Sequence, residues 1–332
     1  MSVGCASEIL FAGRTFPCDV SRCARDEVFV PNHRVLLLTL GLFAVYAHVA
    51  AAQDLDHRRV SPSQRNALTQ TGRETRHRQV YQPFVLPDVD KNRLVAGGIR
   101  RLEGRHLVLY TDVAIDAEVR SLPLVFDQAY ELWRAYFEID QRPKQPWKIS
   151  GCLMRERKTF VGAGLLPDNV PPFRHGYSLG KALWLDDQPT PYYRRHLLLH
   201  EGTHAFVNTL LGGDGPPWYN EGLAEFLATH RWRDGRLTLG YFPTSADEVP
   251  MLGRIHLVQK AVASDRALSL DDVLNFGATA HIRNEPYAWC WALTTLLDGH
   301  PRYRRRFRRL HAMRPKGDLT ERFKSSLGDD DW

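Results

Sequence analysis

The 332-residue sequence has few cysteines, no long hydrophobic run and no large charge of either sign. Its five cysteines include no Cys-x-x-Cys pair, so no metal cluster held by thiolates is indicated. Only Cys152 and Cys290 lie beyond residue 52. Their apolar neighbours favour core positions, although export would permit a disulfide between them. The formal net charge of +6 is modest, so we expect no nucleic-acid partner.

The most apolar stretch covers residues 35–47, and its length of about 13 residues falls short of the roughly 20 that a membrane-spanning helix needs. A basic flank precedes it and an Ala-x-Ala site follows, a pattern typical of a secretory signal peptide cleaved after Ala52. We therefore expect residues 1–52 to be a leader, the protein to be exported to the periplasm or the extracellular space, and no stable membrane span. The unpatterned residues before the signal indicate translation from Val28 or Val30; an uncleaved N-terminal membrane anchor is the alternative.

Composition divides the remaining chain into three parts. Residues 53–104 carry many arginines among polar side chains and few aromatics, so we expect a basic, disordered linker. Residues 105–312 show apolar side chains at strand and helix periods, which predicts one ordered domain. Residues 313–332 end in aspartates and a tryptophan, and we expect a flexible tail.

The ordered domain has an α+β pattern. We expect a small mixed sheet and an active-site helix in its N-terminal part, followed by a mostly helical C-terminal part. The expected strands cover residues 106–111, 147–153, 180–185 and 236–241. The expected helices cover residues 116–139, 157–162, 190–212, 217–230, 251–262, 270–276, 286–297 and 302–313.

Residues 200–204 read His-Glu-Gly-Thr-His, an H-E-x-x-H pentapeptide. On a helix, residues four apart lie one turn apart on the same face. His200 and His204 can therefore bind one metal ion through two imidazoles, with Glu201 beside them as a carboxylate that takes a proton from metal-bound water. Because the pentapeptide can also arise by chance, its surroundings must decide.

Those surroundings favour a metal site. Thr190 is a good N-cap, Pro191 suits the first helical position, and Gly212 closes the predicted helix. The helix is apolar almost all round, so we expect it to be buried. Histidines and a glutamate inside a buried helix are costly without partners, and a metal ion would provide one.

A catalytic zinc ion takes three protein ligands and leaves the fourth position to water. His196 lies on the same helical face as the other two histidines, but three ligands on one straight helix would span about 12 Å. Glu221 is the better candidate, because the residues between it and His204 allow the helix to end, turn and return on a second helix. Glu225, one turn further, could accept the free N–H of a ligand histidine.

Together with H-E-x-x-H, the segment at 220–226, Asn-Glu-Gly-Leu-Ala-Glu-Phe, resembles the gluzincin zinc metallopeptidases. The likeness is closest to the peptidase-MA-like domains of exported bacterial proteins, which carry a later Tyr-Ala-x-x-Trp-Ala helix; the corresponding segment here is residues 287–292, Tyr-Ala-Trp-Cys-Trp-Ala. The resemblance covers roughly residues 105–312. It implies a zincin-like fold with Zn²⁺ as cofactor.

By this resemblance, His200, His204 and Glu221 are the zinc ligands. Glu201 is the general base, which takes a proton from the zinc-activated water and delivers it to the leaving amine. Glu225 is the acceptor that fixes a ligand histidine. The implied substrate is a peptide or protein.

The sequence predicts two further roles. Tyr287 is the expected donor to the oxyanion of the tetrahedral intermediate, with His256 and His281 as alternatives. A strand containing Ala182, Leu183 and Trp184 could pair with an extended substrate, or could equally be an ordinary core strand.

The aminopeptidases of the clan carry a G-x-M-E-N-like stretch, which this sequence lacks, so endopeptidase activity is expected by default. Two alternatives stay open: a catalytically silent zincin-fold binding protein, and a zinc hydrolase of a non-peptide substrate. The presence of Glu201 favours an enzyme, because a silent scaffold does not need it. The sequence makes no prediction of the oligomeric state.

Overall fold

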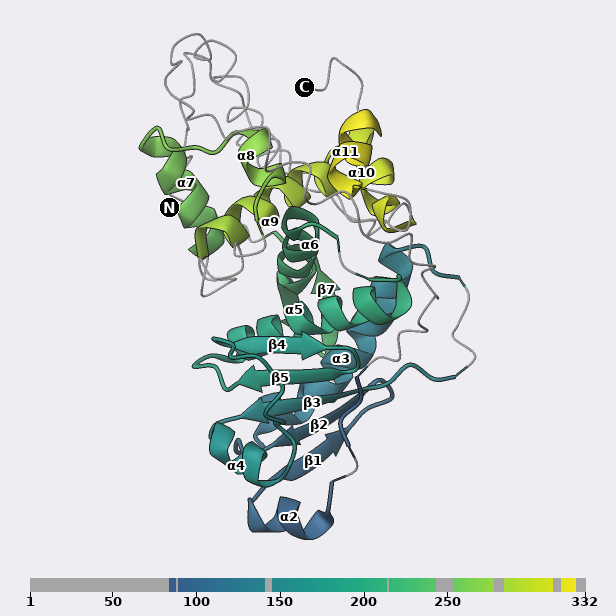
Figure 1. Ribbon diagram of the computed structural model, residues 1–332, viewed down its shortest axis with the longest axis vertical. Helices are drawn as coiled ribbons and strands as arrows, with labels where there is room; N and C mark the ends of the chain where they lie inside the picture. Colours follow the sequence, from purple (N-terminus) through teal and green to yellow (C-terminus); the bar gives the residue numbers. More distant parts are fainter. Residues whose placement is uncertain are drawn as a thin grey trace, which may run out of the picture. The chain divides into compact units, whose positions relative to one another are not determined.

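The computed structural model of the chain describes residues 84–87, 89–140, 145–213, 215–242, 253–277, 284–312 and 318–326 (Figure 1). These residues belong to one compact unit, Asn32–Trp332. The expected signal peptide and start site lie outside the described residues. Among the described residues, no helix combines the length and the apolar character that crossing a membrane requires.

A five-stranded mixed sheet has the strand order β1-β2-β3-β5-β4. β2, β3 and β5 run parallel, while β1 and β4 pair antiparallel at the two edges. These strands cover Arg100–Glu103 (β1), Leu107–Thr111 (β2), Ile149–Met154 (β3), Gly176–Leu179 (β4) and Ala182–Asp186 (β5). The structure is therefore mixed α/β with a small mixed sheet, as the sequence pattern predicts.

Ten described helices and a β-hairpin accompany this sheet. The helices are Lys91–Ala96 (α2), Ala117–Tyr136 (α3), Arg157–Gly162 (α4), Pro191–Leu210 (α5), Pro217–Ala228 (α6), Gly253–Ala263 (α7), Leu270–Leu274 (α8), Asn284–Gly299 (α9), Pro301–Arg308 (α10) and Leu319–Ser326 (α11). The hairpin consists of His230–Arg233 (β6) and Arg236–Leu239 (β7). Its first residue, His230, was expected as the end of the helix 217–230, but α6 ends at Ala228 and His230 begins β6.

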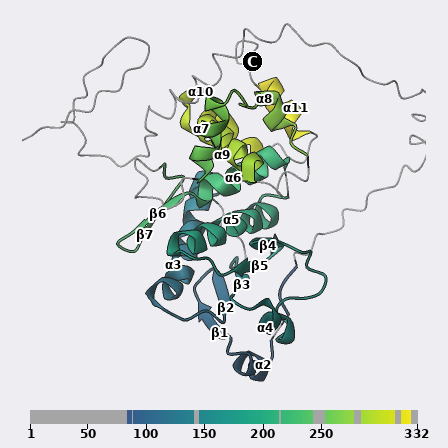
Figure 2. The same ribbon diagram turned by 90° about the vertical axis from the view of Figure 1, so that its left-hand side faces the viewer.

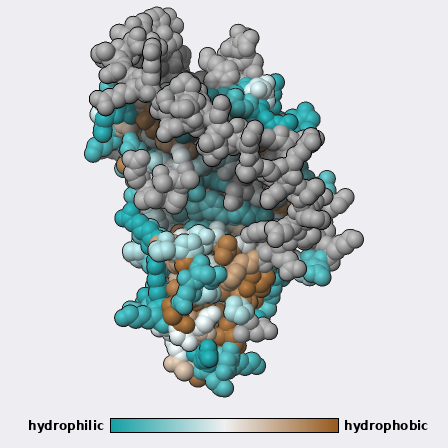
Figure 3. Space-filling view, in the orientation of Figure 1, coloured by the Kyte–Doolittle hydropathy of each residue, from teal (hydrophilic) through white to brown (hydrophobic). Residues whose placement is uncertain are grey.

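Side chains that alternate along the central strands divide the core between two faces of the sheet. One face is covered by α3 and α5 (Figure 2), and on it Leu183 and Leu185 pack in a cluster with buried residues of these two helices. On the other face, Ala182 and Trp184 pack in a smaller cluster with residues of α4 and of the segment before β1. Figure 3 shows apolar side chains gathered over the β4, β5 and α4 part of the molecule.

α3 and α5 each begin at a capping side chain, of which Thr190 was predicted from the sequence. Asp116 and Thr190 each accept a hydrogen bond from the backbone N–H three residues on, at 2.7 and 3.2 Å. Pro191 follows in the first turn of α5, where its missing N–H costs no hydrogen bond. The predicted start of α5 is thus confirmed, and the helix ends at Leu210, two residues before Gly212.

α6 lies between α5 and α9 (Figure 2). Its approach to α9 depends on Gly222, where an added Cβ would lie 2.8 Å from the carbonyl oxygen of Cys290. α7 and α10 in turn pack against α9. The sheet layer is therefore followed by a helical part, and α6 is the helix that joins them.

Regular structure begins earlier than the sequence predicts. α2 and β1 both fall within residues 53–104, which were expected to form a linker. β1 pairs with β2 along its whole length, although its side chains are mostly exposed. A strand held chiefly by main-chain hydrogen bonds at a sheet edge carries little apolar signal, which explains the difference.

The expected tail also contains regular structure. Leu319 and Phe323, one turn apart on α11, are buried. The indole N–H of Trp218 on α6 donates to the hydroxyl oxygen of Thr320 at 2.9 Å. α11 is thus packed against α6, and residues 313–332 are not a flexible tail throughout.

The strand proposed for substrate pairing has no free edge. β5 pairs with β3 on one side and with β4 on the other, and Ala182, Leu183 and Trp184 are all fully buried. The structure therefore agrees with the alternative of an ordinary core strand, and the edge of the sheet belongs to β4. Cys152 and Cys290 are likewise buried and free, so the core alternative also applies to the two cysteines.

Candidate metal centre

α5 and α6 face each other across a group of histidines and glutamates. His200 and His204 lie one turn apart on α5, and Glu221 lies on α6. The opposite side of α5 is packed tightly against α3 at Gly202, where a Cβ would lie 2.6 Å from a ring carbon of Phe126 and 2.8 Å from one of Trp133. This close packing fixes the position of α5 relative to α3, and with it the position of His200 and His204 on the opposite side of α5.

Three atoms with metal-binding chemistry converge between the helices. Nε2 of His200 lies 3.2 Å from Nε2 of His204, and both nitrogens lie 3.4 Å from Oε2 of Glu221. Ligands placed tetrahedrally about 2.1 Å from a zinc ion lie about 3.4 Å from one another. The triangle therefore has the size that one ion with these three ligands requires. The 3.4 Å contacts are also longer than ordinary hydrogen bonds.

Burial and mutual charge shift the pKa values of the three groups. Burial lowers the pKa of His200, but its contacts with Glu221 and Glu225 outweigh this effect and raise the pKa to about 10. Burial also opposes the charged form of His204, whose pKa the Glu221 charge nevertheless raises. For Glu221, burial raises the pKa, and the two histidines hold it well below its usual range. The group thus stabilises positive charge beside a carboxylate, and a divalent cation could replace the bound protons.

Glu201 lies on the sheet side of α5. An added Cβ on Gly176 would lie 2.8 Å from Oε1 of Glu201, so the carboxylate lies directly against β4. Burial raises the pKa of Glu201, while the charges of His200 and His204 and a hydrogen bond from Ser178 oppose the rise. A raised carboxyl pKa suits a group that must accept and return a proton near neutral pH.

β4 directs main-chain groups toward the open side of the sheet beside Glu201. The N–H of Asp186 donates to the carbonyl oxygen of His175 at 2.8 Å, so residues 175, 177 and 179 are the ones that exchange hydrogen bonds with β5. The N–H and C=O groups of Gly176 and Ser178 consequently point away from β5. An added strand could pair with these groups.

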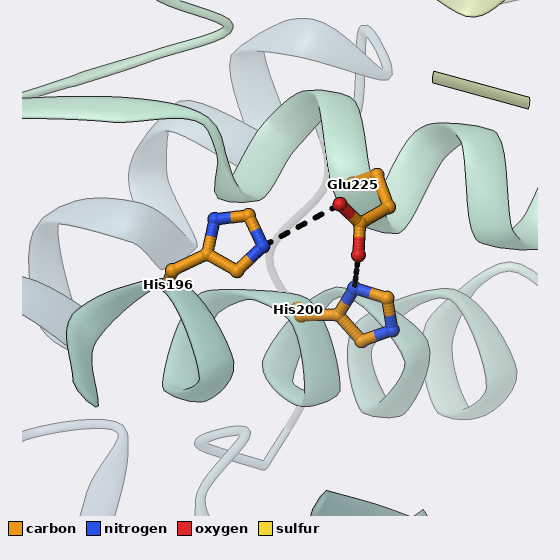
Figure 4. Close-up of side chains that lie close together, drawn as sticks. All are labelled: His196, His200 and Glu225. Atoms are coloured by element: carbon orange, nitrogen blue, oxygen red, sulfur yellow. Dashed lines mark ion pairs between the residues drawn. The ribbon is translucent and has the colours of Figure 1, made fainter. Parts of the chain in front are cut away.

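Glu225 contacts His200 from the side opposite Glu221. Glu225 is only 3% exposed, and its Oε1 lies 3.2 Å from Nδ1 of His200 (Figure 4). A carboxylate at Nδ1 keeps the proton on that nitrogen, so that Nε2 is the nitrogen that would offer its electron pair to a metal ion once its own proton has left. The structure places Glu225 where the sequence predicts an acceptor for a ligand histidine. Oε2 of Glu225 lies 3.5 Å from Nε2 of His196, which takes a polar role rather than joining the three-atom triangle.

Arg254 completes the surroundings of Glu225, and the sequence analysis does not identify it. Its Nε donates to Oε2 of Glu225 at 2.8 Å and its Nη2 donates to Oε1 at 2.9 Å. The guanidinium lies over the ring of Tyr287, 5.2 Å from the ring centroid. Arg254 comes from α7, and no helical or motif spacing relates it to Glu225, so the sequence carries no signal for this pair.

Tyr287 lies beside the centre on α9. Its ring is 5.9 Å from that of His200 in an edge-on arrangement. Burial raises the pKa of Tyr287 well above its ordinary value, so the hydroxyl keeps its proton at neutral pH. His256 is exposed on α7, and the described contacts do not bring it to the centre; His281 lies outside the described residues.

Comparison with protein-family models and with curated proteins finds no match to this chain.

Proposed function

We propose that the protein is an exported zinc peptidase with a zincin-like fold. The observation that carries this proposal is the triangle formed by Nε2 of His200, Nε2 of His204 and Oε2 of Glu221, with sides of 3.2, 3.4 and 3.4 Å. Two imidazoles and one carboxylate are a ligand set typical of catalytic zinc, which keeps a fourth position open. A zinc ion bound there supplies a Lewis acid that polarises a carbonyl group and acidifies water.

Glu201 is proposed as the general base. It is buried beside the ligand histidines and has a raised pKa, so it can take a proton from the attacking water and return it to the leaving amine. Peptide hydrolysis requires both transfers, because an amine leaves poorly without a proton. Glu225 contributes by holding the Nδ1 proton of His200.

The β4 edge is proposed to bind the substrate main chain. Gly176 and Ser178 direct their N–H and C=O groups away from β5, and Gly176 adjoins Glu201. A peptide added antiparallel or parallel to β4 would therefore bring its main chain past the proposed base. This favours extended peptides over compact non-peptide substrates. The open edge also favours internal segments of a chain over a free terminus, which fits an endopeptidase.

Tyr287 is proposed to donate a hydrogen bond to the oxyanion. Its hydroxyl stays protonated, and its ring lies against His200. A positioned donor of this kind stabilises charge that develops only in the transition state. Export is proposed from the signal peptide that the leader sequence indicates.

The proposal is tested by zinc content and by cleavage of a mixed peptide library, followed by mass spectrometry. The protein should contain about one zinc ion per chain after reconstitution and dialysis. Glu201→Gln should retain the zinc and lose activity by about 100- to 10,000-fold, because the general base is removed. Glu285→Gln, an exposed glutamate at the start of α9, is the matched control and should behave as the parent does.

The results separate the alternatives. A parent protein without zinc would overturn the proposal. A zinc-loaded parent that cleaves no peptide would instead indicate a binding protein or a hydrolase of another bond. If Glu201→Gln cleaved as fast as the parent, Glu201 would not be the base.

A further inference from the structure

A second group of metal-binding side chains lies next to the first. His196, His200 and Glu225 each offer one ligand atom, and these atoms lie within 4.8 Å of one another. His200 belongs to both groups, because its Nε2 faces Glu221 while its Nδ1 faces Glu225. Figure 4 shows the carboxylate of Glu225 between the two histidine rings. By composition alone, this second group could bind a transition-metal cation as the first could.

The two groups differ in what already neutralises the carboxylate. In the second group, both oxygens of Glu225 accept hydrogen bonds from Arg254, at 2.8 and 2.9 Å. The guanidinium is permanently charged, and its planar fork matches a carboxylate on both oxygens at once. For Glu221 of the first group, the described charged contacts are with the two histidines.

Arg254 is also held in place from its other side. Its guanidinium lies 5.2 Å from the ring centroid of Tyr287, a cation–π contact. The side chain is only 30% exposed, so its charge is weakly screened by solvent. A divalent ion bound to Glu225 would therefore have to displace this cation or lie close to it, and like charges at that distance repel strongly.

We propose that Arg254 takes the place of a second cation, so that the group formed by His196, His200 and Glu225 stays free of metal. The carboxylate of Glu225 then contacts Nδ1 of His200 instead of binding an ion. On this view Arg254 is a positioning residue with two effects. It prevents binding of a second transition-metal ion, and it orients Glu225 so that His200 directs Nε2 at the first site. Loss of Arg254 opens a second site for a divalent transition-metal cation such as Zn²⁺ and weakens the first. Because His200 belongs to both groups, binding of the second ion releases its Nδ1 proton to solvent, and the imidazolate bridges the two ions. The inference rests on the proposed zinc site, since it concerns the number of ions bound.

Arg254→Met tests this directly, because it removes the charge and keeps much of the apolar stem. The parent should bind about one Zn²⁺ per chain and Arg254→Met about two, measured by elemental analysis after dialysis against buffered zinc. Affinity for the first ion, measured by chelator competition, should fall by about 10- to 100-fold in Arg254→Met. Arg254→Lys keeps a positive charge and should bind about one ion, with the affinity partly restored.

Two further variants complete the design. Adding His196→Asn to Arg254→Met removes a ligand of the second group and should return the content to about one ion. Lys260→Ala, an exposed residue on the same helix, should match the parent. Co²⁺ substitution gives an independent readout, because a second site adds a second set of absorption bands, which a purely structural effect of Arg254 would not produce.

The outcomes distinguish this inference from the proposed function. A parent without metal would overturn the zinc site itself. A parent with one ion and Arg254→Met also with one ion, or a parent with two ions, would overturn only the role of Arg254. If Arg254→Met does not fold, His196→Asn alone decides: the parent content and affinity should be retained, and loss of an ion would show that the second group binds metal in the parent.

Discussion

Gly176 lies so close to Glu201 that an added Cβ would be 2.8 Å from Oε1 of the carboxylate. The same Cβ would lie 2.9 Å from a methyl carbon of Leu197, so it could not be accommodated by moving Glu201 alone. We expect Gly176→Ala to displace the proposed base and lower kcat/KM for peptide cleavage by about 10- to 100-fold, because small misplacements near reacting groups are costly. Zinc content should not change, since the atoms nearest to the added Cβ belong to Glu201 and Leu197, neither of which is a proposed ligand.

Gly162→Ala is the matched control for this substitution. Gly162 ends α4, and an added Cβ there would meet nothing within 4 Å. Its kcat/KM should equal that of the parent. Equal activity in Gly176→Ala would show that Glu201 is not constrained by β4.

Replacing Glu221 should weaken zinc binding more than any other single change on α6. The loss of groups that only orient a ligand typically costs about 10- to 100-fold in affinity, so the loss of a ligand itself should exceed about 100-fold. Glu221→Gln keeps the size of the side chain and removes its charge, and chelator competition measures the effect. Glu285→Gln on α9 should bind zinc as the parent does. Unchanged affinity in Glu221→Gln would place the third ligand elsewhere.

Zinc affinity should rise with pH. In the metal-free protein the contacts with Glu221 and Glu225 overcome the effect of burial and raise the pKa of His200 to about 10. A proton on Nε2 must leave before that nitrogen binds metal. Between pH 6 and pH 8, well below this pKa, affinity should increase by up to about tenfold per pH unit for each proton released. A dissociation constant that does not depend on pH, after correction for the pH dependence of the chelator, would contradict competition between the metal and a proton on Nε2 of His200.

The same shift predicts how metal-free stability depends on pH. The folded-state pKa of His200 lies above the ordinary value of 6.5, so its contribution to the free energy of unfolding is complete below about pH 6.5 and is lost as pH rises through about 10. Denaturant midpoints of the metal-free protein should therefore fall between pH 7 and pH 10. The zinc-loaded protein should show a smaller fall, since metal-bound His200 carries no such proton. Parallel curves for the two forms would contradict the prediction.

Gly202 should be required for packing rather than for chemistry. A Cβ at this position would lie 2.6 Å from Phe126 and 2.8 Å from Trp133, so α5 would have to move away from α3. Overpacking of this kind costs about 1–3 kcal/mol, although alanine recovers up to about 1 kcal/mol of helix propensity. Gly202→Ala should lower the free energy of unfolding in denaturant, whereas Gly162→Ala should not. A Gly202→Ala protein as stable as the parent would show that α3 and α5 can separate at no cost.

The helix with the pentapeptide could be predicted because its signals are local. Thr190 caps α5 and Pro191 starts it, and both lie next to each other in the sequence. Glu221 and Glu225 follow from chain connectivity, since α5 ends, the chain turns and α6 returns. The distances of His200 and His204 to Glu221 needed the structure, because they depend on how the two helices pack.

Arg254 and the β4 edge could not be predicted in this way. Arg254 reaches Glu225 only because α7 and α6 both pack against α9, an arrangement that no short pattern encodes. β4 is four residues long and partly buried throughout, and it follows a proline-rich loop, so it has neither the length nor the alternation of a recognisable strand. The buried pair Leu319 and Phe323 on α11, by contrast, has helical spacing that the sequence does contain.

The hydrogen bond between Trp218 and Thr320 joins residues 102 positions apart. Trp218 lies three residues before Glu221 on α6, and its indole ring also packs against Phe323, 5.3 Å between ring centroids. A shortened chain that stops at residue 312, the boundary suggested by composition, would leave this indole without its acceptor and uncover one side of α6. α11 is therefore part of the support of Glu221, the proposed carboxylate ligand, and removing α11 would disturb the candidate metal centre.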